Sequence, residues 1–337
     1  MNRTGLIFLI VSCVLLTLII GFNSDKSAKI NGVSLVAPQS KVGKEIYQPI
    51  NRIAANWVAI IPYSFTKRSD PKIRFHYNGQ WWGESVTGTI QTIIYAKEMG
   101  LNVMLKPHTW VLGEGWAGDF NLNSDEEWQV WEDSYREYIL TFAKVADSLD
   151  VPLFCIGTEY RKAVVKRPLF WKRLIKDVKV IYKGKITYAA NWDNYQNVSF
   201  WSDLDYIGID AYFPISEEKT PTTDQLKSGW KPIVNELEIF SKRLDKPILF
   251  TEFGYKSTDY AADGHWKYQS KDLNTNQLAQ ANAYKAAFEL WNKPWFGGGF
   301  LWKWHSNHHF VGGPTCKEFT PQNKIAEDAI QQFFSKN

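Results

Sequence analysis

The sequence predicts one α/β domain, a (β/α)8 TIM barrel of eight parallel strands that alternate with helices, and two observations predict it. Eight short apolar runs recur along the chain, and most are continuous rather than alternating, as is typical of strands buried on both faces. Amphipathic helical patterns lie between these runs. The barrel is therefore expected to span residues 30–335, without an interdomain linker or an internal repeat.

The sequence predicts the positions of three of the helices and of all eight strands. Three helices stand out at 127–149, 168–182 and 277–291, where apolar residues recur every three or four positions. The first begins with a capping box, in which Ser124 precedes Glu127 by three positions. Strands are expected at Gly32–Ala37, Trp57–Pro62, Asn102–Pro107, Pro152–Gly157, Lys185–Ala190, Tyr206–Ala211, Pro247–Thr251 and Gly298–Trp302.

A separate apolar run of 17 residues, Leu6 to Phe22, precedes the predicted barrel and follows Arg3. It is long for the apolar core of a signal peptide and slightly short for a membrane span. We expect residues 1–23 to be a signal peptide or an uncleaved membrane anchor, with Arg3 on the cytoplasmic side. The domain would then work in the periplasm, at the cell surface or outside the cell.

Composition narrows the class of partner. The 39 basic and 35 acidic residues are mixed along the chain, so no nucleic-acid partner is expected. The 16 tryptophans are unusual, and several of them, Trp81, Trp82, Trp116 and Trp266, fall in loops. Core packing accounts for part of this number. An aromatic ring also packs against the C–H face of a sugar, so the loop tryptophans favour a carbohydrate partner.

Two glutamates carry the strongest chemical signal. Glu159 and Glu252 each follow an apolar, strand-like run, and they lie 93 positions apart. In a barrel, the carboxyl ends of all the strands meet at one mouth, where catalytic groups sit. Paired carboxylates at that mouth are what glycosidic hydrolysis requires, one as proton donor and one as nucleophile or base. No metal site or cofactor is expected, because the histidines near the last strand lack acidic or cysteine ligands at fixed spacing.

Polar and aromatic residues at the other strand ends are candidates for substrate binding. Lys106 and His108 are expected to bond sugar hydroxyls, although Lys106 could instead pair with a carboxylate at the rim. Tyr212 is expected either to donate to Glu252 or to form part of the wall. Trp302 is expected to be the floor under the sugar, with core packing as the alternative. The full set is Lys106, His108, Trp110, Thr158, Asn191, Trp192, Asp210, Tyr212, Tyr255 and Trp302.

Five linked strings resemble glycoside hydrolase family 113, the β-mannanase-like barrels of the retaining clan A. They are residues 105–108, 157–159, 186–192, 200–208 and 247–255. The resemblance implies endo-acting hydrolysis of β-1,4-mannosidic bonds in mannan or glucomannan, with retention. It also implies that Glu159 is the acid/base and Glu252 the nucleophile. Most of the superfamily has asparagine before the acid/base, whereas this chain has Thr158, so the choice of sugar stays open.

Other functions stay possible on the sequence: a different clan A specificity such as β-glucan, an exo-acting mannosidase, or a carbohydrate-binding barrel without catalysis. The presence of both carboxylates favours catalysis. Retention requires carboxyl groups about 5–5.5 Å apart. At that separation, we expect burial and the charge of Glu252 to raise the pKa of Glu159.

Overall fold

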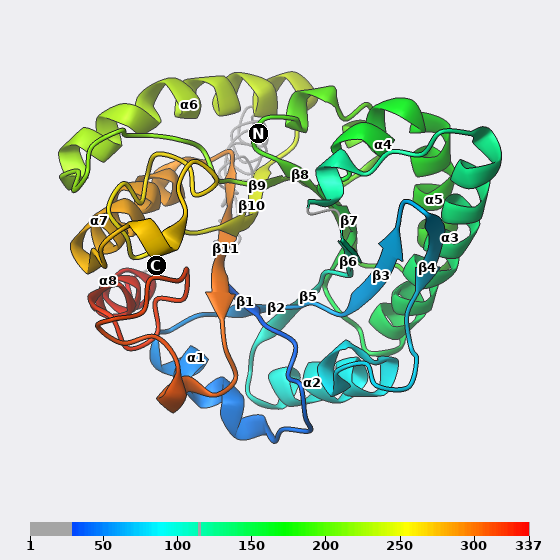
Figure 1. The fold of residues 1–337 in the computed structure, drawn as a ribbon, viewed down its shortest axis with the longest axis horizontal. Coiled ribbons are helices and arrows are strands. Elements are labelled where there is room, and N and C mark those ends of the chain that lie inside the picture. Colours follow the sequence, from blue (N-terminus) through cyan, green and yellow to red (C-terminus); the bar gives the residue numbers. More distant parts are fainter. Residues whose placement is uncertain (1–28, 114–115, 337) are drawn as a thin grey trace, which may run out of the picture.

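The computed structural model of the protein describes residues 29–113 and 116–336 (Figure 1). The predicted segment over residues 1–23 lies outside the described residues. All eight predicted barrel strands are present. They are β1 (Ile30–Leu35), β2 (Trp57–Ile60), β5 (Asn102–Leu105), β7 (Leu153–Thr158), β8 (Lys185–Asn191), β9 (Ile207–Asp210), β10 (Ile248–Phe253) and β11 (Phe296–Trp304).

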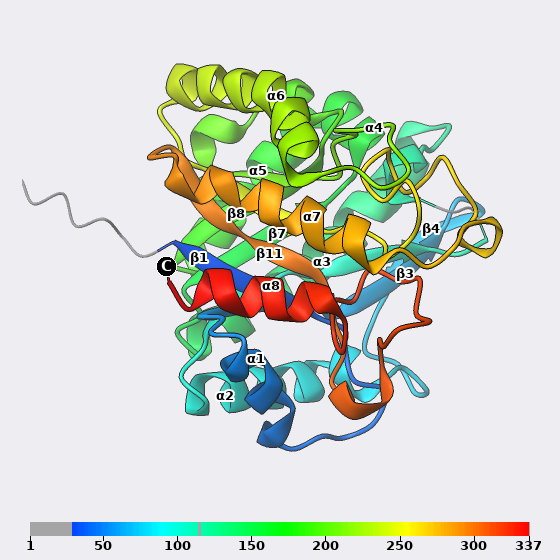
Figure 2. The same cartoon turned by 90° about the vertical axis from the view of Figure 1, so that its left-hand side faces the viewer.

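These strands close into a parallel barrel in the order β1-β11-β10-β9-β8-β7-β5-β2. The predicted fold class is therefore confirmed. Each neighbouring pair runs parallel, so every strand ends at the same mouth of the barrel. Figure 1 looks onto the barrel with the helices arranged around it, and Figure 2 shows α6, α7 and α8 along its outside.

Eight α-helices are found in the described residues, and the three predicted ones lie among them. The predicted capping box is present, because Ser124 accepts from the Glu127 N–H while the Glu127 carboxylate accepts from the Ser124 N–H. Helix α7 is shorter than predicted, because its last turn tightens into a 3-10 segment, Phe288–Asn292. The helices are α1 (Gln48–Arg52), α2 (Val86–Glu98), α3 (Asp125–Ser148), α4 (Arg161–Lys166), α5 (Pro168–Ile181), α6 (Thr223–Leu244), α7 (Gln277–Ala287) and α8 (Ile325–Phe334).

Buried side chains form two layers that follow the alternation of each strand. Ala59, Met104 and Leu249 belong to a small cluster that fills the barrel interior. Their strand neighbours, such as Val58 and Phe250, belong to a larger cluster that packs the strands against the helices. This rigid double core holds the strand ends, and thus the side chains at the mouth, in fixed positions.

A second, three-stranded sheet was not predicted. It consists of β3 (Tyr63–Lys67), β4 (Asp70–Arg74) and β6 (His108–Val111), in the order β4-β3-β6. Only two residues separate the end of β5 from the start of β6, so β6 continues the direction of the barrel strand past the mouth. The sheet packs on α3, where Ser134 Oγ accepts from the Ile73 N–H at 2.9 Å. The small sheet therefore extends the wall of the barrel beyond the strand ends on one side of the mouth.

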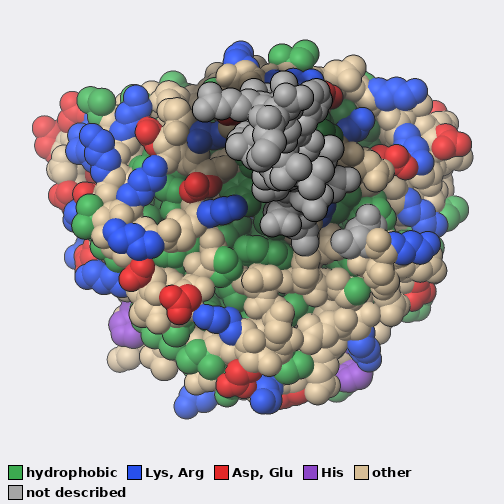
Figure 3. Space-filling view, turned by 180° about the vertical axis from the view of Figure 1, so that it is seen from behind, with side chains coloured by type: hydrophobic (Ala, Val, Ile, Leu, Met, Phe, Trp, Pro, Cys, Tyr) green, Lys and Arg blue, Asp and Glu red, His purple; other side chains and the backbone are tan. Residues whose placement is uncertain are grey.

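The surface carries charges of both signs on the face opposite that of Figure 1, where basic and acidic side chains are interspersed (Figure 3). Within residues 29–113 and 116–336, no helix combines the length and the apolar character needed to cross a bilayer. Cys155 and Cys316 are both free thiols.

Candidate active site

A cleft of about 340 Å³ opens at the mouth of the barrel. Both predicted catalytic glutamates line it, Glu159 just after β7 and Glu252 near the end of β10. The two carboxylates thus converge from distant parts of the chain. The cleft is lined by Tyr63, His108, Thr109, Trp110, Val111, Trp116, Ala117, Thr158, Glu159, Glu252 and Trp302.

The backbone of Glu159 adopts an unusual conformation. Its φ angle is 54°, in the left-handed region that few residues other than glycine occupy. Neighbouring groups hold this turn, since its N–H donates to the Ala189 carbonyl at 2.8 Å and its own carbonyl accepts from the Arg161 N–H at 2.7 Å. Strained conformations of this kind concentrate at functional sites.

The carboxylate of Glu159 is oriented by a loop residue. The indole N–H of Trp116 donates to Glu159 Oε2. Arg161 lies over the Trp116 ring at 4.8 Å and pairs with Asp119 and Asp193 at 2.8 and 3.2 Å. The two carboxylates hold the Arg161 guanidinium against the Trp116 ring. Trp116 in turn orients the carboxylate of Glu159.

The electrostatic surroundings of Glu159 suit a proton donor. Burial raises the pKa of its carboxyl well above the ordinary value, and the negative charges of Asp210 and Glu252 raise that pKa further. The Trp116 hydrogen bond opposes the shift without cancelling it. The raised pKa favours the protonated form that a proton donor needs, and its direction is the one predicted from burial and the charge of Glu252.

Glu252 is instead surrounded by groups that favour its charged form. Lys106 Nζ lies 2.5 Å from Oε1, and the Tyr212 hydroxyl donates to Oε2 at 2.7 Å. The predicted contact between Tyr212 and Glu252 is thus present. His108 Nε2 lies 3.4 Å from Oε1, and its ring is neutral because burial and the nearby lysine lower its pKa. Hydrogen bonds from a cation and a phenol stabilise a carboxylate, so Glu252 is suited to act as the nucleophile.

Lys106 and Asp210 lie behind Glu252 and have no exposed surface. Lys106 Nζ pairs with Asp210 Oδ1 at 3.1 Å, and Thr251 donates to the same oxygen at 2.7 Å. Burial and the charge of Glu252 raise the pKa of the Asp210 carboxyl. Lys106 and Asp210 were predicted to contact sugar hydroxyls, but in the structure they form a buried ion pair with each other. An ion pair was the alternative considered for Lys106.

The cleft wall combines aromatic faces with free polar atoms. His108 and Trp302 are stacked at 6.0 Å and 9°, and Tyr63 packs edge-on against His108 at 5.2 Å. Trp110, on β6, is 56% exposed. Thr158 Oγ1 and His108 Nε2 are buried and have no hydrogen-bond partner among the described residues. Buried polar atoms are nearly always satisfied, so these two are available to ligand hydroxyls.

The remaining predicted residues lie away from the cleft. Asn191 is the last residue of β8 and donates to Asp193 at 2.8 Å, and Trp192 follows it, but neither residue lines this cleft. Tyr255 is buried and packs edge-on against Tyr284 at 5.4 Å, so it does not line the cleft. The site residues that the prediction omitted include Trp116, for which a tryptophan in a loop after a strand end was the available signal.

Within the described residues, no group of three or more His, Cys, Asp or Glu side chains could hold a metal ion. The cleft brings together one carboxyl group with a raised pKa and one that is hydrogen-bonded by Lys106 and Tyr212, between aromatic walls.

Comparison with known proteins gives one family and one fold. The family model of Glycoside Hydrolase Family 113 matches residues 39–319. A solved complex of a GH113 β-1,4-mannanase is 24% identical, with a TM-score of 0.77 over 92% of this chain and 99% of that chain. GH113 β-mannanase AaManA from Alicyclobacillus acidocaldarius is 24% identical, with a TM-score of 0.78 over 92% and 98% of the two chains.

A Glycoside Hydrolase Family 5 mannosidase from Rhizomucor miehei is 12% identical, with a TM-score of 0.61 over 91% and 92% of the two chains. No curated protein matches the chain. The structural likenesses share the barrel architecture, and the family match covers most of the described residues.

Proposed function

Because the chain belongs to glycoside hydrolase family 113, we propose that it cleaves β-1,4-mannosidic bonds within mannan chains and retains the anomeric configuration. The observation that carries the proposal is the pairing in one cleft of Glu159, whose pKa is raised, with Glu252, which is hydrogen-bonded by Lys106 and Tyr212. The choice of linkage is supported by the likeness of this chain to solved GH113 β-1,4-mannanases.

In the first step, a carboxylate oxygen of Glu252 attacks the anomeric carbon while Glu159 gives its proton to the leaving glycosidic oxygen. The bond between the anomeric carbon and that oxygen breaks, and an ester to Glu252 forms. Tyr212 and Lys106 hold the attacking carboxylate in place, which reduces the entropy that the reaction must lose.

In the second step, Glu159 changes its role. Once Glu252 is esterified, it no longer carries the negative charge that raises the pKa of Glu159. The pKa of Glu159 falls, so its carboxylate can take a proton from a water molecule as that water attacks the anomeric carbon. The ester bond breaks and Glu252 leaves as a carboxylate, which completes a double displacement with net retention.

The wall residues support a sugar substrate. The face of Trp302 and the exposed ring of Trp110 can pack against pyranose C–H groups. The free atoms Thr158 Oγ1 and His108 Nε2 can bond sugar hydroxyls. Thr158 stands beside the proton donor, so we propose that it contacts the sugar at the cleaved bond.

The proposal is tested by incubating the protein with mannan, glucomannan, xylan and β-glucan and measuring the reducing ends released. We expect the highest kcat/KM on mannan or glucomannan, and proton NMR should show the β-anomer as the first product. An initial α-anomer would contradict retention. Release from xylan or β-glucan alone would contradict the mannan specificity.

Azide distinguishes the two glutamates. Glu159→Ala should still form the ester from an aryl β-mannoside with a good leaving group, and azide should then release a β-mannosyl azide, because azide needs no general base. Glu252→Ala should give an α-mannosyl azide instead, because azide replaces the missing nucleophile and inverts the centre once. Products of the same configuration from both variants would refute the assigned roles.

We also propose that the domain acts outside the cytoplasm. The support is the apolar run from Leu6 to Phe22 and the basic Arg3 before it. Fractionation of cells that express the full chain tests this proposal. Recovery of all the protein from the cytoplasm would refute it, and release by detergent rather than by salt would favour an anchor.

A further inference from the structure

Two tryptophans from different loops stack on each other outside the catalytic cleft. Trp192 follows β8, and Trp266 belongs to the long loop between β10 and α7. Their ring centroids are 5.3 Å apart, with an interplanar angle of 15°. Trp266 is 48% exposed. The pair, which we name the Trp192–Trp266 platform, therefore keeps a large aromatic surface in solvent.

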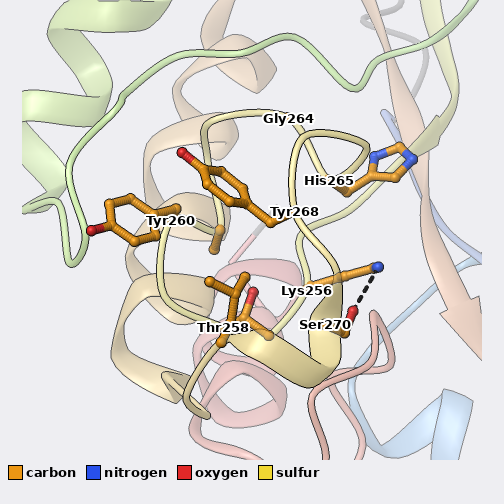
Figure 4. Close-up of a pocket in the computed structure, with 9 residues that line it drawn as sticks. Lys256, Thr258, Tyr260, Gly264, His265, Tyr268 and Ser270 are labelled. Carbon is orange, nitrogen blue, oxygen red and sulfur yellow. Dashed lines mark hydrogen bonds between the residues drawn. The ribbon is translucent and has the colours of Figure 1, made fainter.

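The loop that carries Trp266 is internally braced. Asp263 accepts from Lys267 at 2.7 Å and from Tyr268 at 2.8 Å. Lys256 donates to Ser270 at 2.8 Å, the bond drawn as a dashed line in Figure 4. The hollow inside the loop measures about 10 Å³, which is too small for a ligand. The loop thus serves to present its outer residues rather than to bind something within it.

His265 links the platform to the catalytic cleft. Figure 4 shows its ring pointing away from the loop interior. It packs edge-on against Tyr212 at 4.9 Å and against the neighbouring Trp266 at 5.2 Å. Tyr212 in turn donates to Glu252. An unbroken aromatic wall therefore runs from the nucleophile out to the platform.

A groove of about 460 Å³ lies beside Trp192. Phe213 and Pro214 form its apolar side, while Gln196, Asn197 and Glu236 supply amide and carboxylate groups. Flat aromatic faces beside amides and carboxylates match the C–H faces and hydroxyls of sugars. In the closed barrel, β8 and β9 lie between β7 and β10 on one arc, whereas β5 and β2 lie on the other arc. Because the glutamates come from β7 and β10, the groove beside Trp192 and the Trp110 side of the cleft flank them.

We propose that the Trp192–Trp266 platform binds further sugar units of the same β-linked chain, beyond the two sugars joined by the bond that is cleaved. The inference rests on the proposed function, and it deepens that function. The occupant is the substrate chain itself, because the aromatic wall through His265 and Tyr212 is continuous with the nucleophile. A chain held on both flanks of the glutamates is cut internally, which makes the enzyme endo-acting.

The test compares long and short substrates in Trp266→Ala. On a β-1,4-linked mannose hexamer, kcat/KM should fall about tenfold, the loss expected when one stacking contact is removed. On an aryl β-mannoside, which is too short to reach the platform, kcat/KM should stay unchanged. Trp266→Phe should retain part of the hexamer activity. Ile239→Ala, a change at a 67% exposed position of α6, should alter neither substrate.

A binding measurement separates recognition from catalysis. In the Glu252→Gln background, calorimetric titration with the hexamer should show a Kd about tenfold weaker after Trp266→Ala. Unchanged hexamer kinetics and Kd would overturn the proposal. Equal losses on the hexamer and the aryl mannoside would also overturn it, because Trp266 would then act through His265 on the catalytic groups.

The proposed function can fail separately. If the wild-type enzyme releases nothing from mannan but cleaves another β-linked glycan, the mannan assignment is wrong and the same comparison applies to oligomers of that glycan. If neither the hexamer nor any of those oligomers binds to Glu252→Gln, the platform proposal is overturned regardless of activity.

Discussion

Lys106→Met removes an ammonium that touches both Glu252 and Asp210, at 2.5 and 3.1 Å, while nearly preserving side-chain length. Lys106 has no exposed surface, so bulk water does not readily replace the lost charge. Removing one partner of a buried ion pair typically costs about 3–5 kcal/mol, because the other charge is left uncompensated. We expect a loss near the lower bound, since Asp210 has a raised pKa and can take up a proton.

The stability lost in Lys106→Met should depend on pH. Burial opposes the charge of Lys106, but Asp210 and Glu252 outweigh it and raise its pKa, so the lysine is charged throughout the acid and neutral range. The stabilisation that Lys106 provides then depends on whether Asp210 is ionised. The destabilisation of Lys106→Met should be largest near pH 8 and should shrink toward pH 4, where the Asp210 carboxyl, with its raised pKa, binds a proton.

Activity should change as well, because the ionised nucleophile loses a charge-assisted hydrogen bond worth about 1.5–3 kcal/mol. A loss of about 1.36 kcal/mol corresponds to a factor of ten in rate, so kcat/KM should fall about 10- to 100-fold. Urea unfolding at several pH values and initial rates on an aryl β-mannoside measure the two effects.

Two further variants serve as controls. Lys44→Met breaks an exposed pair with Glu98 at 3.2 Å and should change stability by less than about 0.5 kcal/mol. Lys106→Met combined with Asp210→Asn should recover part of the lost stability, because it removes one of the two stranded carboxylates. Wild-type stability at pH 8 together with wild-type kcat/KM in Lys106→Met would refute this account of the buried cluster.

Three other changes give distinct readouts. Trp116→Phe removes the indole donor that lowers the pKa of Glu159, so that pKa should rise and the basic limb of kcat/KM should move to higher pH; a shift to lower pH would contradict this. Tyr212→Phe removes the 2.7 Å bond to Glu252, so kcat/KM should fall about 10- to 100-fold with unchanged circular dichroism; wild-type kinetics would exclude a role for that bond. Glu159→Gln should be more stable than wild type at pH 8, because the raised pKa of Glu159 means that its ionised form destabilises the fold above the unfolded value of about 4.3; the difference, followed by thermal unfolding, should vanish toward pH 4.

The barrel strands were predictable because parallel strands buried on both faces leave continuous apolar runs in the sequence. The sheet of β3, β4 and β6 has no such continuous apolar runs. Strand β4 begins with Asp70-Pro71, a pair that predicts a turn, and β6 has only four residues that start directly after the predicted strand Asn102–Pro107 ends. Its strands also carry exposed side chains, which weakens any apolar signal.

The two glutamates were predictable because a barrel brings all strand ends to one mouth. The partner of Lys106 was not, since Asp210 lies 104 positions away and meets it only through the strand order of the closed barrel. The contact of Trp116 with Glu159 was equally hidden, because a loop side chain approaches the site by a path that periodicity does not encode.

The left-handed backbone at Glu159 has a practical consequence for engineering. A side chain costs about 1–2 kcal/mol in that conformation, whereas glycine adopts it freely. A library screened for heat resistance alone should therefore enrich Glu159→Gly, a hardier protein that has lost its acid/base. Selection for thermal tolerance must include turnover at every round, or it will discard the enzyme while improving the scaffold.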